Sequence, residues 1–148
     1  MYKKNKNAVL LIAGVKPDNE IMNKMIRDYD LQDSVKLLGL RSDIPNVLQC
    51  YDCYLMPSKW EGFPVSLLEA QASGLLCFVS SSVTKQAKIN YNVYYLDLSE
   101  GVEKWTDVIE SHMSNNIRIE NVNLIIEAGF DISKTAEKLL SVYAGENI

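Results

Sequence analysis

Five short apolar runs constrain the fold of this 148-residue chain more than any other feature. They cover residues 8–13, 35–38, 53–56, 76–79 and 93–96, and glycine or proline follows each of the first three. A continuous apolar run of this length is typical of a strand that is covered on both faces, and such strands belong to parallel sheets. We therefore expect the first run to be a buried strand.

Segments with apolar residues at helical spacing separate these runs. Asp18 or Asn19 is a suitable cap for the first of them. We expect helices over residues 19–29, 43–51, 64–72, 101–113, 120–128 and 133–143, with a break at Asn115 and Asn116. Alternating strands and helices predict an α/β fold with right-handed crossovers: a Rossmann-like, doubly wound parallel sheet in three layers. We expect residues 1–148 to form a single domain.

Composition and charge exclude several classes of function. The net charge is −4 and most basic residues are scattered, which argues against nucleic acid as the main partner. No apolar run approaches the roughly 18 residues of a membrane span, and no signal-peptide pattern follows the N-terminus. We expect a cytoplasmic protein without a transmembrane segment, with peripheral attachment at the inner membrane face as an alternative.

The cysteines and the single histidine do not form a recognisable reactive centre. Cys50 and Cys53 make a C-x-x-C pair, but Cys77 is the only other cysteine, so the second pair of a zinc site is missing. We expect all three thiols to be buried and structural. His112 lies late in an amphipathic segment, where we expect a surface position, which removes Ser-His-Asp and histidine–metal sites.

Residues 58–74 carry most of the functional signal: a loop with two aromatic residues leads into a helix. Pro64 suits the first helical position. A helix start presents unpaired N–H groups and a positive dipole end, and phosphate is the usual occupant of such a site. Gly62 lets a ligand approach the backbone closely, and the amides of Val65 and Ser66 are candidate donors.

Two glutamates flank this helix start, Glu61 and Glu69, eight positions apart. A carboxylate beside a phosphate is repulsive, so each glutamate more plausibly accepts hydrogen bonds from neutral hydroxyls. A nucleotide-sugar has hydroxyls on both sides of a diphosphate and would satisfy all three groups. The spacing alone fits equally well a capped surface helix with two solvated acids.

The residues around the two glutamates resemble a known family. The retaining nucleotide-sugar glycosyltransferases of family four, which have GT-B architecture, carry a similar pair of glutamates with E-G-F at the front and E-A-x-A-x-G at the back. The resemblance covers residues 8–98 and includes a capsule and exopolysaccharide branch. The matching segments are residues 10–14, 35–39, 43–45, 52–58, 61–64, 68–70, 73–74 and 83–85.

This resemblance implies a role for each site residue. Glu61 is the catalytic residue at the donor sugar, and Glu69 holds the ribose hydroxyls. Gly62, Phe63, Pro64, Val65 and Ser66 would line the diphosphate, Gly39 and Arg41 would lie at the base, and Ser58 is a further donor-binding residue. We also expect Lys85 to be a phosphate partner, because its loop follows the fourth expected strand. Such enzymes need no metal or other cofactor at the site, so none is expected here.

The chain also departs from the family pattern. The family's donor domain begins with one more strand and helix, which carry an Arg and a Lys for the diphosphate, and no such pair precedes Ala8. The N-terminal acceptor domain has no counterpart either. We expect a sheet that lacks its central strand, a chain without transferase activity by itself, a missing acceptor domain or partner chain, and self-association through open sheet edges.

The sequence therefore favours the donor-binding portion of a retaining glycosyltransferase that transfers a hexosyl group to a polysaccharide or lipid-linked acceptor. A non-catalytic partner subunit of a split glycosyltransferase is the alternative. A nucleotide-sugar epimerase-like domain is a further one, although the acid and histidine groups of such enzymes have no clear place here.

Overall fold

The computed structural model describes residues 7–114, 118 and 122–145. It divides into two compact units, residues 1–44 and 45–148. In the described part of the chain, no helix is long and apolar enough to cross a membrane. The expectation of a single domain stays a prediction.

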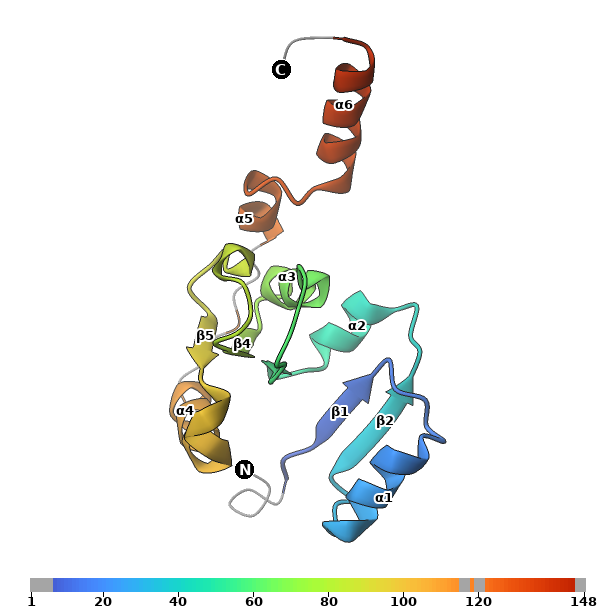
Figure 1. The fold of residues 1–148 in the computed structure, drawn as a ribbon, viewed down its shortest axis with the longest axis vertical. Coiled ribbons are helices and arrows are strands. Elements are labelled where there is room, and N and C mark those ends of the chain that lie inside the picture. Colours follow the sequence, from blue (N-terminus) through green and yellow to red (C-terminus); the bar gives the residue numbers. More distant parts are fainter. Residues whose placement is uncertain (1–6, 115–117, 119–121, 146–148) are drawn as a thin grey trace. The chain divides into compact units, whose positions relative to one another are not determined.

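The first unit is a strand–helix–strand arrangement (Figure 1). Strand β1 (Leu10–Ala13) pairs in parallel with β2 (Val35–Gly39), and helix α1 (Glu20–Asp28) connects them. The Asn19 side chain caps α1 by accepting a hydrogen bond from the Met22 amide at 2.9 Å. The expected helix and cap are confirmed, and the parallel pair has the crossover expected of a doubly wound fold.

The second unit holds a three-stranded parallel sheet in the order β3-β4-β5. These strands are Cys53–Met56, Leu76–Ser80 and Val93–Leu96, and α2 (Ile44–Gln49) precedes them. Helix α3 (Val65–Ala72) connects β3 to β4 and packs against β4 and α5 (Val122–Glu127). Two short 3-10 turns, η1 (Lys85–Ala87) and η2 (Leu98–Glu100), flank β5, and α4 (Gly101–Met113) and α6 (Ile132–Tyr143) complete the unit.

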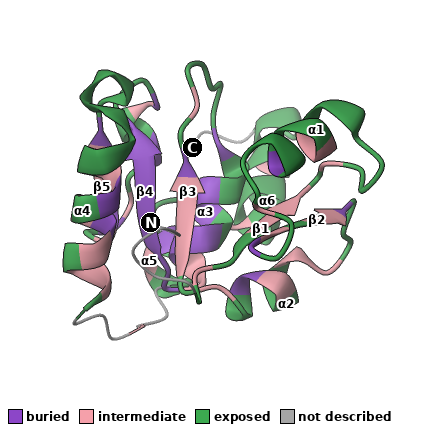
Figure 2. Cartoon of the chain, turned by 90° about the horizontal axis from the view of Figure 1, so that it is seen from below, coloured by how far each residue is buried: buried purple, intermediate pink, exposed green. Residues whose placement is uncertain are grey.

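The core of the second unit lies where α3 covers β4. All five residues of β4 are buried, as are Leu67, Leu68 and Ala70 of α3 (Figure 2). Burial follows strand pairing, because β4 has a neighbour on both sides whereas β3 and β5 have one each in the described part of the chain. The α/β class with parallel strands is confirmed.

The expected burial of β1 is wrong. Leu10 is 44% exposed, and the other residues of the strand are only half-buried. Among the described strands, β1 pairs with β2 alone. An apolar run predicts a strand, but its burial depends on neighbours that lie elsewhere in the chain.

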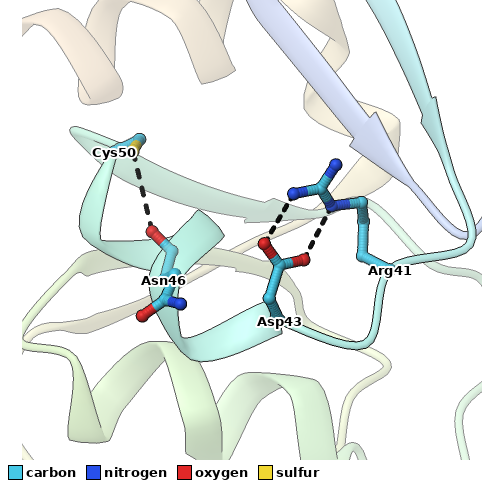
Figure 3. A network of polar contacts seen from close by, with 4 residues as sticks. All are labelled: Arg41, Asp43, Asn46 and Cys50. Atoms are coloured by element: carbon cyan, nitrogen blue, oxygen red, sulfur yellow. Dashed lines mark hydrogen bonds and ion pairs between the residues drawn. The ribbon is translucent and has the colours of Figure 1, made fainter.

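The cysteines and His112 also depart from the expectations. Cys50 is exposed and Cys53 half-buried, so only Cys77 is a buried thiol. The Cys50 thiol donates to the carbonyl of Asn46 at 3.6 Å (Figure 3). The His112 ring is half-buried, 4.1 Å from the ring centroid of Tyr94, so it packs against the sheet. The expected break at Asn115 and Asn116 lies outside the described residues.

We expect Cys50 to be the only one of the three thiols that a reagent modifies rapidly in the folded chain at pH 8. Burial raises the pKa of Cys53 to about 11 and that of Cys77 still further, so both are protonated and shielded. Counting modified thiols by mass spectrometry checks this. Cys50→Ser should remove the fast reaction, and rapid modification of Cys77 in the native protein would contradict it.

Candidate functional site

The start of α3 has no side-chain cap. Pro64 is the N-cap residue, so the helix begins one position later than expected, at Val65. The Pro64 carbonyl accepts a hydrogen bond from the Leu67 amide at 3.1 Å, but proline has no side-chain oxygen for the first-turn amides of Val65 and Ser66. A helix start of this kind favours an anion as the missing acceptor.

The Tyr54 hydroxyl connects β3 to this helix start. It lies 2.8 Å from the Ser66 hydroxyl, where either oxygen could be the donor. Burial raises the pKa of Tyr54, the Ser66 hydrogen bond opposes this, and the negative charges of Glu61 and Glu69 raise it further. The charges of Glu61 and Glu69 are the smallest of these causes, so the contact that ties β3 to the first turn of α3 is the hydrogen bond between Tyr54 and Ser66.

Glu61 and Glu69 are exposed, as is Val65, whose side chain was expected on the buried face of the helix. A side chain added at Gly62 would meet nothing within 4 Å, so the space beyond this glycine is open. Near the start of α3 the chain thus offers exposed carboxylates that can accept hydrogen bonds from hydroxyl groups, and first-turn amides that can donate to an anion.

Phe63 and Ser58 fix the loop in front of the helix. The Phe63 ring stacks on Phe130, with a centroid distance of 5.3 Å, and so links the loop to the segment after α5. The Ser58 carbonyl accepts a hydrogen bond from the Ser82 hydroxyl at 2.8 Å. These contacts hold the loop in place without using its amides.

Lys85 lies on η1, after β4. Its Nζ atom is 3.1 Å from the centroid of the Tyr95 ring, a favourable cation–π contact. Burial lowers the pKa of Lys85, and the neighbouring charge of Lys88 lowers it further. The Tyr95 hydroxyl in turn donates to the Thr84 carbonyl at 3.0 Å. The role of Lys85 toward phosphate stays a prediction.

Gly39 and Arg41 belong to the first unit. Gly39 is buried, with a φ of +71°, and stands opposite Ala13 at an irregularity in the β1–β2 pairing. The Arg41 guanidinium makes two hydrogen bonds to the Asp43 carboxylate, at 2.8 and 2.6 Å (Figure 3). These bonds lower the pKa of Asp43. The positive φ explains why a glycine stands at position 39 without any role in ligand binding. The charge of Arg41 is already paired with that of Asp43.

Two residues of this region escaped the sequence analysis. Gln71 of α3 is fully buried and binds the segment after β4, which carries Lys85. A polar residue on the face of an otherwise apolar helix is the signal that could have found it. Tyr54 has no such signal, because a tyrosine in a strand is ordinary. Among the described residues, no group of three His, Cys, Asp or Glu side chains could hold a metal.

Comparison with known proteins identifies the family. The family model "Glycosyl transferases group 1" matches residues 1–129. An Escherichia coli UDP-Gal:alpha-D-GlcNAc-diphosphoundecaprenol alpha-1,3-galactosyltransferase is 33% identical over 93% of this chain and 37% of its own length. The capsular polysaccharide biosynthesis glycosyltransferase CapH of Staphylococcus aureus is 25% identical over 80% of this chain and 33% of its own.

A solved structure supports the same fold. The pneumococcal O-GlcNAc transferase GtfA, in complex with UDP and GlcNAc, superposes with a TM-score of 0.58 at 19% identity. The alignment covers 91% of this chain and 26% of GtfA. The chain thus spans about a third of the length of these two relatives. By its sequence match and its parallel α/β fold, the chain belongs to the group 1 glycosyltransferase family.

Proposed function

We propose that this chain is the donor-binding portion of a retaining glycosyltransferase and that it holds a nucleotide-sugar at the start of α3. One observation carries the proposal: the first-turn amides of α3 have no side-chain cap, the Ser66 hydroxyl in that turn bonds to Tyr54, and the exposed Glu61 and Glu69 stand on either side of the turn in the sequence. Hydroxyl acceptors on both sides of an anion site suit a diphosphate with a sugar at each end.

Each residue has a stated role in this proposal. The amides of Val65 and Ser66 bind a phosphate oxygen, and the bare backbone at Gly62 lets the diphosphate come close. Glu69 accepts hydrogen bonds from the ribose hydroxyls. Glu61 orients the hexosyl group and stabilises the positive charge that develops at its anomeric carbon during transfer. No metal ion is required, because helix amides and Lys85 offset the phosphate charge.

The whole enzyme would transfer the hexosyl group to a polysaccharide or lipid-linked acceptor with retained configuration. The relatives named above support this class of acceptor, since one acts on a diphosphoundecaprenol-linked sugar and another takes part in capsule synthesis. We propose that the 148-residue chain by itself binds the donor without turnover. Release of free hexose or transfer to an added acceptor by the isolated chain would contradict that part.

Glu69→Ala and Glu61→Ala should have different effects on binding. We expect Glu69→Ala to lower the affinity for the nucleoside diphosphate and for its hexosyl derivative alike, by about tenfold, because ribose contacts are common to both. Glu61→Ala should lower the affinity for the hexosyl derivative only. Calorimetric titration with UDP, UDP-galactose and GDP measures this, and Glu103→Ala, an exposed acid on α4, is the control. Wild-type affinities in both variants would remove the assigned roles.

A second function, a non-catalytic partner subunit, is favoured by the sheet edges. In the described part of the chain β1 and β3 each keep an edge without a neighbouring strand, and such edges pair readily with other chains. A pure interaction subunit would bind neither UDP nor GDP, which separates it from the first proposal. Self-association through these edges stays a prediction that sedimentation velocity can check.

A further inference from the structure

We propose that a cleft lined in part by Trp60 binds a pyranose ring. The cleft has a volume of about 350 Å³ and is lined by Lys59 and Trp60, by residues 80–82, and by Asp97 and Leu98. The inference rests on the proposed function in one respect only: it takes the sugar to belong to the donor or the acceptor of that reaction.

The position of the cleft is that of a ligand site. Its lining follows β3, β4 and β5, which end at Met56, Ser80 and Leu96. Ligands of open parallel sheets bind beyond these carboxyl ends. The volume lies near the lower end of the range of about 300–1,000 Å³ for small-molecule sites, which suits a sugar ring better than a whole nucleotide-sugar.

Trp60 gives the cleft an aromatic wall. Its side chain is 90% exposed, although burying an aromatic ring of this size is strongly favourable. A flat apolar ring that stands open beside a cleft can pack against the C–H face of a pyranose. The backbone around it is fixed, because the Ser82 hydroxyl donates to the Ser58 carbonyl, two residues before Trp60.

Asp97, another residue of the lining, offers hydrogen-bond acceptors that are already oriented. The Asp97 carboxylate accepts at Oδ1 from the amide and hydroxyl of Ser99, at 2.8 and 2.7 Å. Its Oδ2 atom accepts only a longer bond, 3.3 Å, from the Ser81 hydroxyl, which leaves capacity for a ligand hydroxyl. The Trp105 indole donates to the Asp97 carbonyl at 2.9 Å and holds the backbone.

The charges of the lining select a neutral ligand. Asp97 contributes a carboxylate, which repels phosphate, and Lys59 is the one cation of the lining. Hydrogen bonds from Ser99 lower the pKa of Asp97, so the carboxylate is ionised at neutral pH. The Ser81 hydroxyl, which is exposed and donates to Asp97, can still accept a hydrogen bond and completes the set. An aromatic face, a carboxylate and hydroxyls are the groups that recognise a sugar ring.

The test uses Trp60→Ala and Asp97→Asn in the full chain. Asp97→Asn keeps the Oδ1 acceptor for Ser99, and Tyr91→Ala removes a similarly exposed aromatic side chain outside the cleft. The probes are UDP, UDP-galactose, UDP-N-acetylglucosamine and the methyl glycosides of both sugars. Saturation-transfer NMR measures the glycosides, and calorimetry measures the nucleotides. Circular dichroism verifies that each variant is folded.

We expect Trp60→Ala and Asp97→Asn to lower the affinity for the sugar-bearing probes by about tenfold and to leave the affinity for UDP unchanged. Tyr91→Ala should bind every probe with wild-type affinity. If UDP-sugars bind more tightly than UDP and this difference in affinity depends on Trp60, the donor sugar is the occupant. Trp60-dependent binding of the methyl glycosides to the UDP-saturated chain identifies an acceptor sugar.

Failure of this inference is distinct from failure of the proposed function. If UDP binds but neither cleft variant changes the affinity for any sugar-bearing probe, the cleft proposal is overturned and the site at α3 stands. If methyl glycosides bind in a Trp60-dependent manner but UDP does not bind, the cleft proposal stands and the proposed function fails. Absence of binding by all probes overturns both.

Discussion

Gln71→Leu is expected to lower the free energy of unfolding of the second unit by about 2–4 kcal/mol. The Gln71 side chain is fully buried. Its Nε2 donates to the Ala87 and Leu67 carbonyls at 2.8 and 3.2 Å. Its Oε1 accepts from the Ile89 and Asn90 amides at 2.9 and 3.2 Å.

Leucine has a similar volume but cannot replace these bonds, so two amides and a carbonyl of the segment after β4 lose their partner. Each such group costs about 1–3 kcal/mol when it stays buried, and the burial of leucine offsets part of that cost. Both tryptophans, Trp60 and Trp105, lie in the second unit. Urea unfolding followed by tryptophan fluorescence therefore reports on the unit that contains the substitution.

Gln86→Ala is the matched control, because this glutamine lies on the same segment with an exposed side chain. We expect its effect to stay within about 0.5 kcal/mol of wild type. If Gln71→Leu unfolds at the same urea concentration as Gln86→Ala, the buried amide does not hold the segment, and the position of Lys85 must have another cause.

Arg118→Ala is expected to cost about 2–3 kcal/mol in the same unit. The guanidinium donates to the Ser73 carbonyl at 2.7 Å, and to those of Leu48, Gln49 and Tyr51 at 3.0, 3.0 and 3.2 Å. These carbonyls stand at the C-terminal ends of α3 and α2, where the helix dipole favours a cation. One side chain thus satisfies four helix-end acceptors.

Arg118→Lys separates charge from geometry. Lysine keeps the positive charge but presents a point donor instead of a planar fork, so we expect it to recover less than half of the loss. Arg118 is only half-buried, so solvent screens the charge and the figure stays below that for a fully buried group. Lys104→Ala, an exposed cation on α4, is the control. Equal stability of Arg118→Lys and wild type would contradict the role of the fork.

The sequence predicted the elements better than their surroundings. The bounds of β3, β5 and α4 agree with the expected ranges, because apolar periodicity and nearby glycine and proline are local signals. The exposure of β1 and of Cys50 could not be predicted, since it depends on which strands and helices lie alongside. Pro64 is an N-cap rather than a first helical residue, a shift of one position that periodicity does not resolve.

The candidate site divides in the same way. Glu61, Glu69 and the start of α3 were accessible from the sequence because they lie within one continuous segment. Tyr54, Gln71 and Arg118 were not, because their hydrogen-bond partners lie between 4 and 70 residues away. The cleft beside Trp60 also needs the structure, since its lining comes from the ends of separate strands. Pairings of this kind depend on topology rather than on pattern.

The central claim is that a nucleoside diphosphate binds to the chain at the start of α3. Titration of the isotope-labelled chain with UDP, and separately with GDP, followed by amide NMR, tests it most directly. We expect the amide resonances of Gly62, Val65 and Ser66 to shift saturably with one of the two nucleotides, and Glu69→Ala to weaken that binding about tenfold. If these amides do not move with either nucleotide up to about 10 mM, where even a weak site with a Kd near 1 mM is nearly full, the claim is contradicted.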